Sequence, residues 1–248
     1  MTGETSPALL SLIFATGQRP SAAALREAGS RPDGIGFAIT HQAEEPGATW
    51  AELLASGLTF DCHGLAPGGA STRPPGETLL GLTSEPEGEA ISLAPGPHIA
   101  DGAALQPVLR MLLALALDLA RLPGVQAVCW HPAASAMEPG YFIRIAEDWL
   151  GGGPFPGLGL IAVRRQKSGG LATQGLAFFV GQELAIEPDK SFKPADIAQL
   201  AVRLIDELIQ LGPVSEPREF ALPGSPAVLA IPIEQGRILR VVRRQHAN

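Results

Sequence analysis

The sequence predicts an α+β fold in which antiparallel or mixed sheets are covered by two long helices. Two apolar segments with helical spacing, at about residues 102–122 and 194–211, predict the helices. Short apolar runs bounded by glycine and proline predict the strands. Two pairs of these runs are separated only by short turns, which favours hairpins, and therefore antiparallel pairing, over a doubly wound parallel sheet.

The first hundred residues predict several strands and one short helix. Ala8–Ala15 is a short apolar run of the kind that forms a buried strand. The segment Ser21–Ala28 predicts a helix with Ser21 as its N-cap and Gly29 at its end. Further elements are expected as strands at 34–40, 58–62 and 78–83, with one or two helical turns at 50–55.

Two segments rich in proline and glycine, 66–76 and 85–96, predict loops or linkers. The first long helix follows them, so we expect the chain to divide near residue 100. The sequence thus predicts two α+β subdomains, 1–100 and 101–248, which are either separate or packed into one compact unit.

The first long helix is expected to begin after Asp101 as its cap and to end at Pro123-Gly124. Its leucines fall on more than one side, which favours burial between two layers. Beyond it, Val125–Trp130 predicts a strand and Tyr141–Leu150 a shorter helix.

The last third of the chain alternates again. The runs 158–164 and 171–180 predict two strands joined by a turn at 167–170. The second long helix is amphipathic, and Gly212-Pro213 ends it. The runs 227–233 and 237–242 predict a final hairpin.

The composition excludes several classes of protein. With 46% hydrophobic and 17% charged residues among 248, the chain has enough apolar surface to fold. A formal net charge of −7 argues against a nucleic-acid partner. The most apolar stretch, 105–122, carries three charged residues and therefore does not predict a membrane span. No secretory signal is recognisable, so a cytoplasmic location is expected.

From Leu105 to about residue 242 the chain resembles a bacterial family, the domain of unknown function 4261 family. The residues that carry the resemblance are LPGVQAVCWHPAASAMEPGYF (122–142), PFPGLGLIAVRR (154–165), GLATQGLAFFVGQELAIEP (170–188) and DIAQLAVRLIDELIQLGP (196–213). The resemblance implies an order of apolar helix, strand, short helix, two strands, long helix and final hairpin. It implies no catalytic residues.

Four residues are candidates for a pocket. Trp130 and His131 end a strand and enter a proline-containing loop, where binding pockets often lie, and His131 would serve as a hydrogen-bond partner or base. His63 follows another strand in the same way, and Glu183 stands near a strand end with other carboxylates. The structural alternative is a core tryptophan, a histidine that caps its strand, and a glutamate exposed to solvent.

Two other groups are weaker candidates. Cys62, His63, Cys129 and His131 supply zinc-type ligands, but adjacent Cys and His point to opposite faces of a strand, so no metal or cofactor is expected. A basic group would meet an acidic partner if its strands lie together, and otherwise forms the charged surface of edge strands. Its members are Arg164, Arg165, Arg240, Arg243 and Arg244.

No assembled catalytic motif of a known type occurs in the chain. We therefore expect a soluble, non-catalytic bacterial protein that binds or regulates another protein. The alternative is an enzyme with a pocket near His63, Trp130 and His131. The sequence leaves open the partner protein and whether the chain forms a homo-oligomer.

Overall fold

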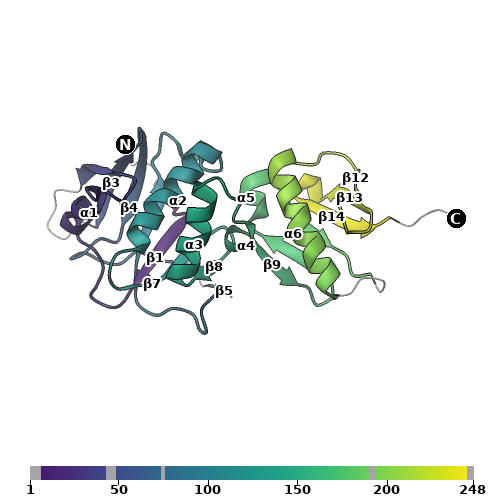
Figure 1. Ribbon diagram of the computed structural model, residues 1–248, viewed down its shortest axis with the longest axis horizontal. Coiled ribbons are helices and arrows are strands. Elements are labelled where there is room, and N and C mark those ends of the chain that lie inside the picture. Colours follow the sequence, from purple (N-terminus) through teal and green to yellow (C-terminus); the bar gives the residue numbers. More distant parts are fainter. Residues whose placement is uncertain (1–6, 43–48, 74–75, 190–193, 245–248) are drawn as a thin grey trace. The chain divides into compact units, whose positions relative to one another are not determined.

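The computed structural model describes residues 7–42, 49–73, 76–189 and 194–244. The chain divides into two compact units, Met1–Gly159 (unit 1) and Leu160–Asn248 (unit 2). Figure 1 shows that each unit combines helices with a sheet, and both sheets contain parallel and antiparallel pairs. This confirms an α+β fold with mixed sheets.

Within its described residues, unit 1 contains a large sheet with helices on it. Its strands are β1 (Leu10–Phe14), β2 (Ala38–Gln42), β3 (Trp50–Ala55), β4 (Leu58–His63), β5 (Thr78–Leu80), β6 (Glu89–Pro95), β7 (Val125–Trp130) and β8 (Ser135–Met137). Its helices are α1 (Ala22–Gly29), α2 (Gln106–Ala120) and α3 (Pro139–Leu150), with a 3-10 turn at Ala100–Gly102. The strand order is β2-β3-β4-β6-β1-β7-β8-β5. The central strands β4-β6-β1-β7, with α1 and α2 as crossovers, form an antiparallel β-α-β-β-α-β arrangement.

Strand β1 joins the two parts of the chain that were expected to form the subdomains 1–100 and 101–248. It pairs with β6 on one side and with β7 on the other, both antiparallel, and all five of its residues are buried. Because residues 10–14 and 125–130 share one sheet, the chain does not divide near residue 100. The division lies instead at 159/160, which differs from the expected subdomains 1–100 and 101–248.

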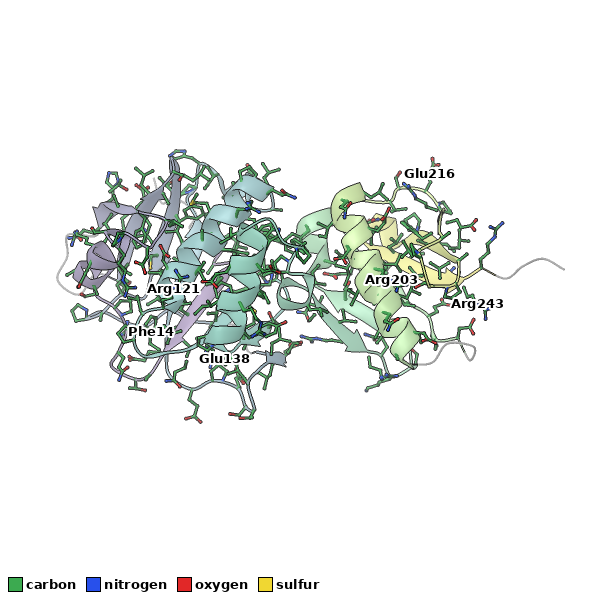
Figure 2. The ribbon with its side chains drawn as sticks, viewed as in Figure 1. Phe14, Arg121, Glu138, Arg203, Glu216 and Arg243 are labelled. Carbon is green, nitrogen blue, oxygen red and sulfur yellow. The ribbon has the colours of Figure 1, made fainter. Side chains whose placement is uncertain are left out.

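Helix α2 packs against the sheet and against α3. It contacts β1, β4, β6 and β7, and eleven of its residues are buried. Its end carries Arg121, which is labelled in Figure 2. Arg121 ties α2 to α3 by an ion pair with Glu147 at 2.5 Å. The expected cap was wrong: Asp101 lies in the 3-10 turn, and the N-cap position is Leu105, with a proline in the first turn.

Unit 2 contains a second mixed sheet. Its strands are β9 (Ala162–Arg165), β10 (Leu171–Gln174), β11 (Glu183–Ile186), β12 (Arg218–Phe220), β13 (Val228–Ile233) and β14 (Ile238–Arg243). Its helices are α5 (Leu176–Val180) and α6 (Pro194–Leu211), with a 3-10 turn at Glu234–Gly236, and α4 (Gly157–Leu160) crosses from unit 1. The strand order is β12-β13-β14-β11-β10-β9.

The amphipathic pattern of α6 is confirmed by its burial. The helix contacts β10, β11 and α5. One stripe of its side chains is buried: Ile197, Leu200, Ala201, Leu204, Ile205 and Leu208. The expected hairpins are also present, since β9 pairs with β10 and β13 with β14, in each case antiparallel.

Four local expectations were wrong. Residues 50–55 form strand β3, whose alternating burial matches a pleated strand. The expected loop at 85–96 contains β6, which lies near the middle of the sheet. The expected strands 158–164 and 171–180 are each shorter, because α4 precedes β9 and α5 follows β10. Gly175 ends β10 with a φ of 97°, a conformation that favours glycine.

Candidate functional site

The large sheet of unit 1 carries a polar row on the face opposite its leucine-rich core. The same face also carries a smaller apolar cluster of Ile13, Ala90, Ala127, Cys129 and Ala136. Antiparallel partners that stand opposite each other point to the same face. The register places His63 opposite Ser92, Ser92 opposite Ser11, and Ser11 opposite Cys129. These four residues therefore form one row across β4, β6, β1 and β7, which we call the polar row.

Ser11 of the polar row contacts a histidine that lies just beyond the end of β7. The Oγ of Ser11 lies 2.8 Å from Nε2 of His131, and Ser11 is 0% exposed. Burial lowers the pKa of His131, and a hydrogen bond to the backbone of Ala8 acts in the opposite direction. In the tautomer with Nε2 unprotonated, His131 accepts the proton of Ser11 at this nitrogen. This is the arrangement of a nucleophile and its base, but the hydroxyl is closed to solvent.

His63 stands at one end of the polar row. Its Nε2 is buried and has no hydrogen-bond partner among the residues that the structure describes. Burial lowers the pKa of His63, while the charge of Asp61 raises it. Asp61 accepts a hydrogen bond from Nε1 of Trp50 at 3.0 Å, so that oxygen orients the indole. Because burial favours its uncharged form, His63 is a neutral group at a half-buried position.

A segment that follows β4 covers the middle of the polar row. The Oγ of Ser92 donates to Oγ of Ser71 at 3.0 Å, and the amide of Ser71 donates to Ala90 O at 2.9 Å. Arg19 holds the same segment by donating to Gly68 O at 2.7 Å. The serines of the row therefore bond to protein groups, and Ser92 is buried.

The four candidate pocket residues do not form one group. Trp130 stands opposite Leu10 on the apolar face and is 0% exposed, so it is a core residue and does not share a pocket wall with His131. His63 lies in the polar row on the other face, and His131 follows β7, where it contacts Ser11. Glu183 belongs to unit 2.

The cysteines and histidines do not assemble into a zinc-type set. Cys62 stands opposite Leu93 on the apolar face, whereas Cys129 lies in the polar row. Burial raises the pKa of Cys62 to about 12 and that of Cys129 to about 11, so both remain thiols at neutral pH. Within the described part of the chain, no three His, Cys, Asp or Glu side chains are placed to hold a metal ion.

Glu183 has a structural partner set of its own. Its carboxylate accepts hydrogen bonds from Thr173 Oγ1 at 2.6 Å and from the backbone amides of Gly175 at 2.7 Å and Ala177 at 3.1 Å. It therefore caps the first turn of α5 from the neighbouring strand β11. The expected exposed or catalytic carboxylate is instead a group that fixes the β10–α5 corner.

Unit 2 presents a sheet face that sequence reasoning missed. The face toward α6 carries the buried side chains, and the opposite face carries half-buried ones. We call its aliphatic part the outer patch; its members are Ala172, Ala185, Leu229, Ile231, Ile233, Ile238 and Val242. The signal was available in the sequence, because the last hairpin is apolar at odd and even positions alike, whereas a sheet open to water on one side is expected to alternate.

Two of the candidate arginines lie on the same face as the outer patch, Arg164 at its edge and Arg240 among its members. The register places Arg164 opposite Ala172, Ala172 opposite Ala185, Ala185 opposite Arg240, and Arg240 opposite Ile231. The two strands that carry the arginines are not adjacent, since β10 and β11 separate them. The arginines thus stand about 14 Å apart at their Cα atoms, with two alanines between them.

A shallow cavity of about 520 Å³ lies at one end of the unit 2 sheet, beside the turn at 234–236. Gln182 forms part of its wall, but its amide is engaged on three sides. It donates to Val214 O at 3.0 Å and to Gly236 O at 2.6 Å, and accepts from Val214 N at 2.7 Å. Gln182 therefore joins three segments of the fold and has little capacity left for a ligand.

Comparisons with protein-family models, with curated proteins and with solved structures found no match. The resemblance to the domain of unknown function 4261 family therefore stays a prediction. Among the helices of the described residues, none has the length and apolar character needed to cross a membrane.

Proposed function

We propose that this chain is a non-catalytic protein that binds or regulates another protein, and that the outer patch of unit 2 is its binding face. In this view the long helices α2 and α6 each cover one face of a sheet. The opposite face of the unit 2 sheet then offers its aliphatic side chains to a partner. A cytoplasmic location and a homo-oligomeric state stay predictions from the sequence.

The observation that carries the proposal is the half-buried aliphatic surface on β13 and β14. The pairs Leu229–Val242 and Ile233–Ile238 stand opposite each other on this face, with Ile231 between them. Contiguous apolar surface of this kind is typical of protein interaction sites. Arginine beside aliphatic residues is a composition that interfaces favour.

The test compares two lysine substitutions on opposite faces of the same unit. Leu229→Lys places a charge in the outer patch, opposite Glu219, whose carboxylate also pairs with Arg244. Gln210→Lys adds the same charge at an exposed position of α6. The full chain is immobilised and exposed to an extract of the source organism, and each retained protein is then purified and titrated against all three forms.

The proposal expects a purified partner that binds the wild-type chain and Gln210→Lys equally and loses binding to Leu229→Lys. If every purified partner binds Leu229→Lys as well as wild type, the outer patch is not the binding face. Circular dichroism of both variants verifies that the fold is retained.

A second candidate function, an enzyme, is supported by one observation, the Ser11–His131 pair at 2.8 Å. The buried position of Ser11 opposes it, since a substrate carbonyl has to reach the hydroxyl. A fluorophosphonate probe tests it directly, with Ser11→Ala as the control. Labelling of the folded chain at Ser11 would support the enzyme, and a folded chain without label at Ser11 would exclude this pair as its nucleophile and base.

A further inference from the structure

We propose that the cavity beside the turn at 234–236 binds an uncharged small molecule with an apolar ring and an amide-type edge. None of the residues that line this cavity belongs to the outer patch. The inference therefore assigns a second site to unit 2, and it does not depend on the proposed function.

The walls of the cavity come from three segments of unit 2 that are distant in the sequence. They are residues 180–182 at the end of α5, 213–215 after α6, and 232–236 at the turn between β13 and β14. Gln182, which is 4% exposed, joins them through its bonds to both backbone groups of Val214 and to Gly236 O. Because Gln182 fixes these segments, the cavity of about 520 Å³ is pre-formed. Sites for small molecules have volumes of roughly 300–1,000 Å³.

The turn between β13 and β14 is strained where it borders the cavity. Glu234 and Gln235 have φ values of 49° and 59°, and Gly236 follows with a φ of 83°. Glycine adopts this left-handed region readily, whereas two consecutive residues with a Cβ raise the energy of the fold. Conformations of this kind are held by their surroundings and cluster at ligand sites. Here Gln182 holds the turn through Gly236 O, and Gln235 lines the cavity.

The lining of the cavity favours a neutral ligand. Within the described part of the chain, every lining residue is uncharged. An ion that entered the cavity would leave water without meeting an opposite charge, which costs free energy. The apolar part of the lining suits a ring, and its members are Val180, Pro213, Val214 and Pro232.

Two polar side chains of the lining are available to a ligand. Gln235 and Ser215 are exposed, and neither side chain has a hydrogen-bond partner among the residues that the structure describes. Since the amide of Gln182 is already engaged, hydrogen bonds to a ligand come from these two residues. A side-chain amide carries N–H donors beside a C=O acceptor, so Gln235 complements a ligand edge with the same pair of groups, as in a lactam or a primary amide.

The experiment uses three neutral probes and two charged relatives. Nicotinamide, 2-pyridone and uracil have a planar ring and an amide-type edge, and nicotinate and orotate are the anionic counterparts of the first and the third. Each compound is titrated into the ¹⁵N-labelled full chain, and the backbone amide shifts of Gly181, Gln182 and Gly236 are followed. A neutral probe is expected to shift these amides in a saturable manner, with a Kd at least tenfold lower than that of its anionic relative.

Three single substitutions test the assigned residues. Gln235→Gly is expected to weaken binding about tenfold, because the amide is lost, and to raise the urea midpoint, because glycine tolerates the left-handed conformation. Ser215→Ala is expected to weaken binding about fivefold, as the loss of one hydrogen bond implies. Gln210→Ala, which removes an amide at an exposed position of α6 outside the cavity, is expected to leave the Kd unchanged.

The outcomes also separate this inference from the proposed function. If no neutral probe shifts the three amides up to its solubility limit, or if Gln235→Gly binds as well as wild type, the site is overturned. Anionic relatives that bind equally well overturn the uncharged ligand. A purified protein partner that loses binding to Gln235→Gly, while no probe binds, assigns the cavity to a protein interface and overturns the small molecule. Leu229→Lys is expected to bind the probes like wild type, so failure here leaves the outer patch untouched.

Discussion

The hydroxyl of Ser11 lies 2.8 Å from Nε2 of His131, although 120 residues separate them in the chain. The contact exists because β1 and β7 pair antiparallel, and His131 N donates to Leu9 O just beyond the end of β7. It joins a serine of the polar row to His131 by a bond between two groups that are largely removed from water. The pair therefore bears first on the stability of unit 1.

Ser11→Ala is expected to lower the free energy of unfolding of unit 1 by about 1–3 kcal/mol, because Nε2 of His131 loses its partner inside the fold. Urea unfolding monitored by circular dichroism measures the change. Ser30→Ala, at an exposed position after α1, is the control and should stay within about 0.5 kcal/mol of wild type. Equal stability of the two variants would contradict the role given to the pair.

The stability of unit 1 is expected to fall as the pH drops below about 6.5. Burial lowers the pKa of both His63 and His131 in the folded chain. Below pH 6.5 the unfolded chain therefore binds protons that the folded chain does not, which favours unfolding. The stability that depends on His63 and His131 being neutral is fully present above pH 6.5. It is lost as the pH falls toward the pKa values of these histidines in the folded chain.

The urea midpoint of wild type between pH 7.5 and 5.5 measures this dependence. Replacement of both histidines, in His63→Gln with His131→Gln, should flatten the profile in this range. A wild-type profile that is already flat would show that neither histidine is buried in its neutral form. Glu52 and Glu89, whose pKa values are lowered by hydrogen bonds, add a separate loss only below about pH 4.5.

Glu183→Gln is expected to destabilise unit 2 by about 1–3 kcal/mol, because the first turn of α5 loses a charged acceptor for its amides. Glu187→Gln removes the same charge four residues later, where the side chain is 50% exposed and its ion pair with Arg240 is long. That control should change stability by less than about 0.5 kcal/mol. The unfolding of each variant in urea distinguishes the two, and equal effects would exclude a special role for Glu183.

Both cysteines are expected to resist alkylation in the folded chain. Their raised pKa values, about 12 for Cys62 and about 11 for Cys129, leave almost no thiolate at pH 8, and both side chains are buried. Iodoacetamide at pH 8 followed by mass spectrometry should show no modification without urea and two modifications in urea. Modification of either thiol in the native protein at the rate of a free thiol would show that its strand opens.

Several elements were predictable because their cause is local. The spacing of apolar residues in α6, the Ser21 cap of α1, whose side chain accepts from Ala24 N, and the turns of both hairpins lie within short segments. Strand β3 was mistaken for helix because a six-residue apolar run fits both periods. Strand β6 was mistaken for loop because the prolines and glycines on either side of it conceal a run that becomes central only through its partners β4 and β1.

The candidate site was less predictable than the fold. Adjacent residues Trp130 and His131 suggested one pocket wall, but they lie on opposite faces of the sheet. Glu183 was a candidate because it is a carboxylate near a strand end. Its partners Thr173 and Ala177 lie in β10 and α5, and the sequence did not predict the corner between these two elements. Arg164 and Arg240 were noted as a basic group, although only the strand order shows that two alanines lie between them.

The sequence by itself determined that the chain folds into helices and sheets, where the amphipathic helix and the hairpins lie, and which residues carry charge, since these depend on composition and on neighbours within a few positions. The tertiary structure alone decided which strands are neighbours, where the chain divides, and which face of each sheet is packed. The physical reason is that pairing between distant strands is set by the burial of the whole apolar surface, so a residue's partners come from segments that its own neighbourhood in the sequence does not specify.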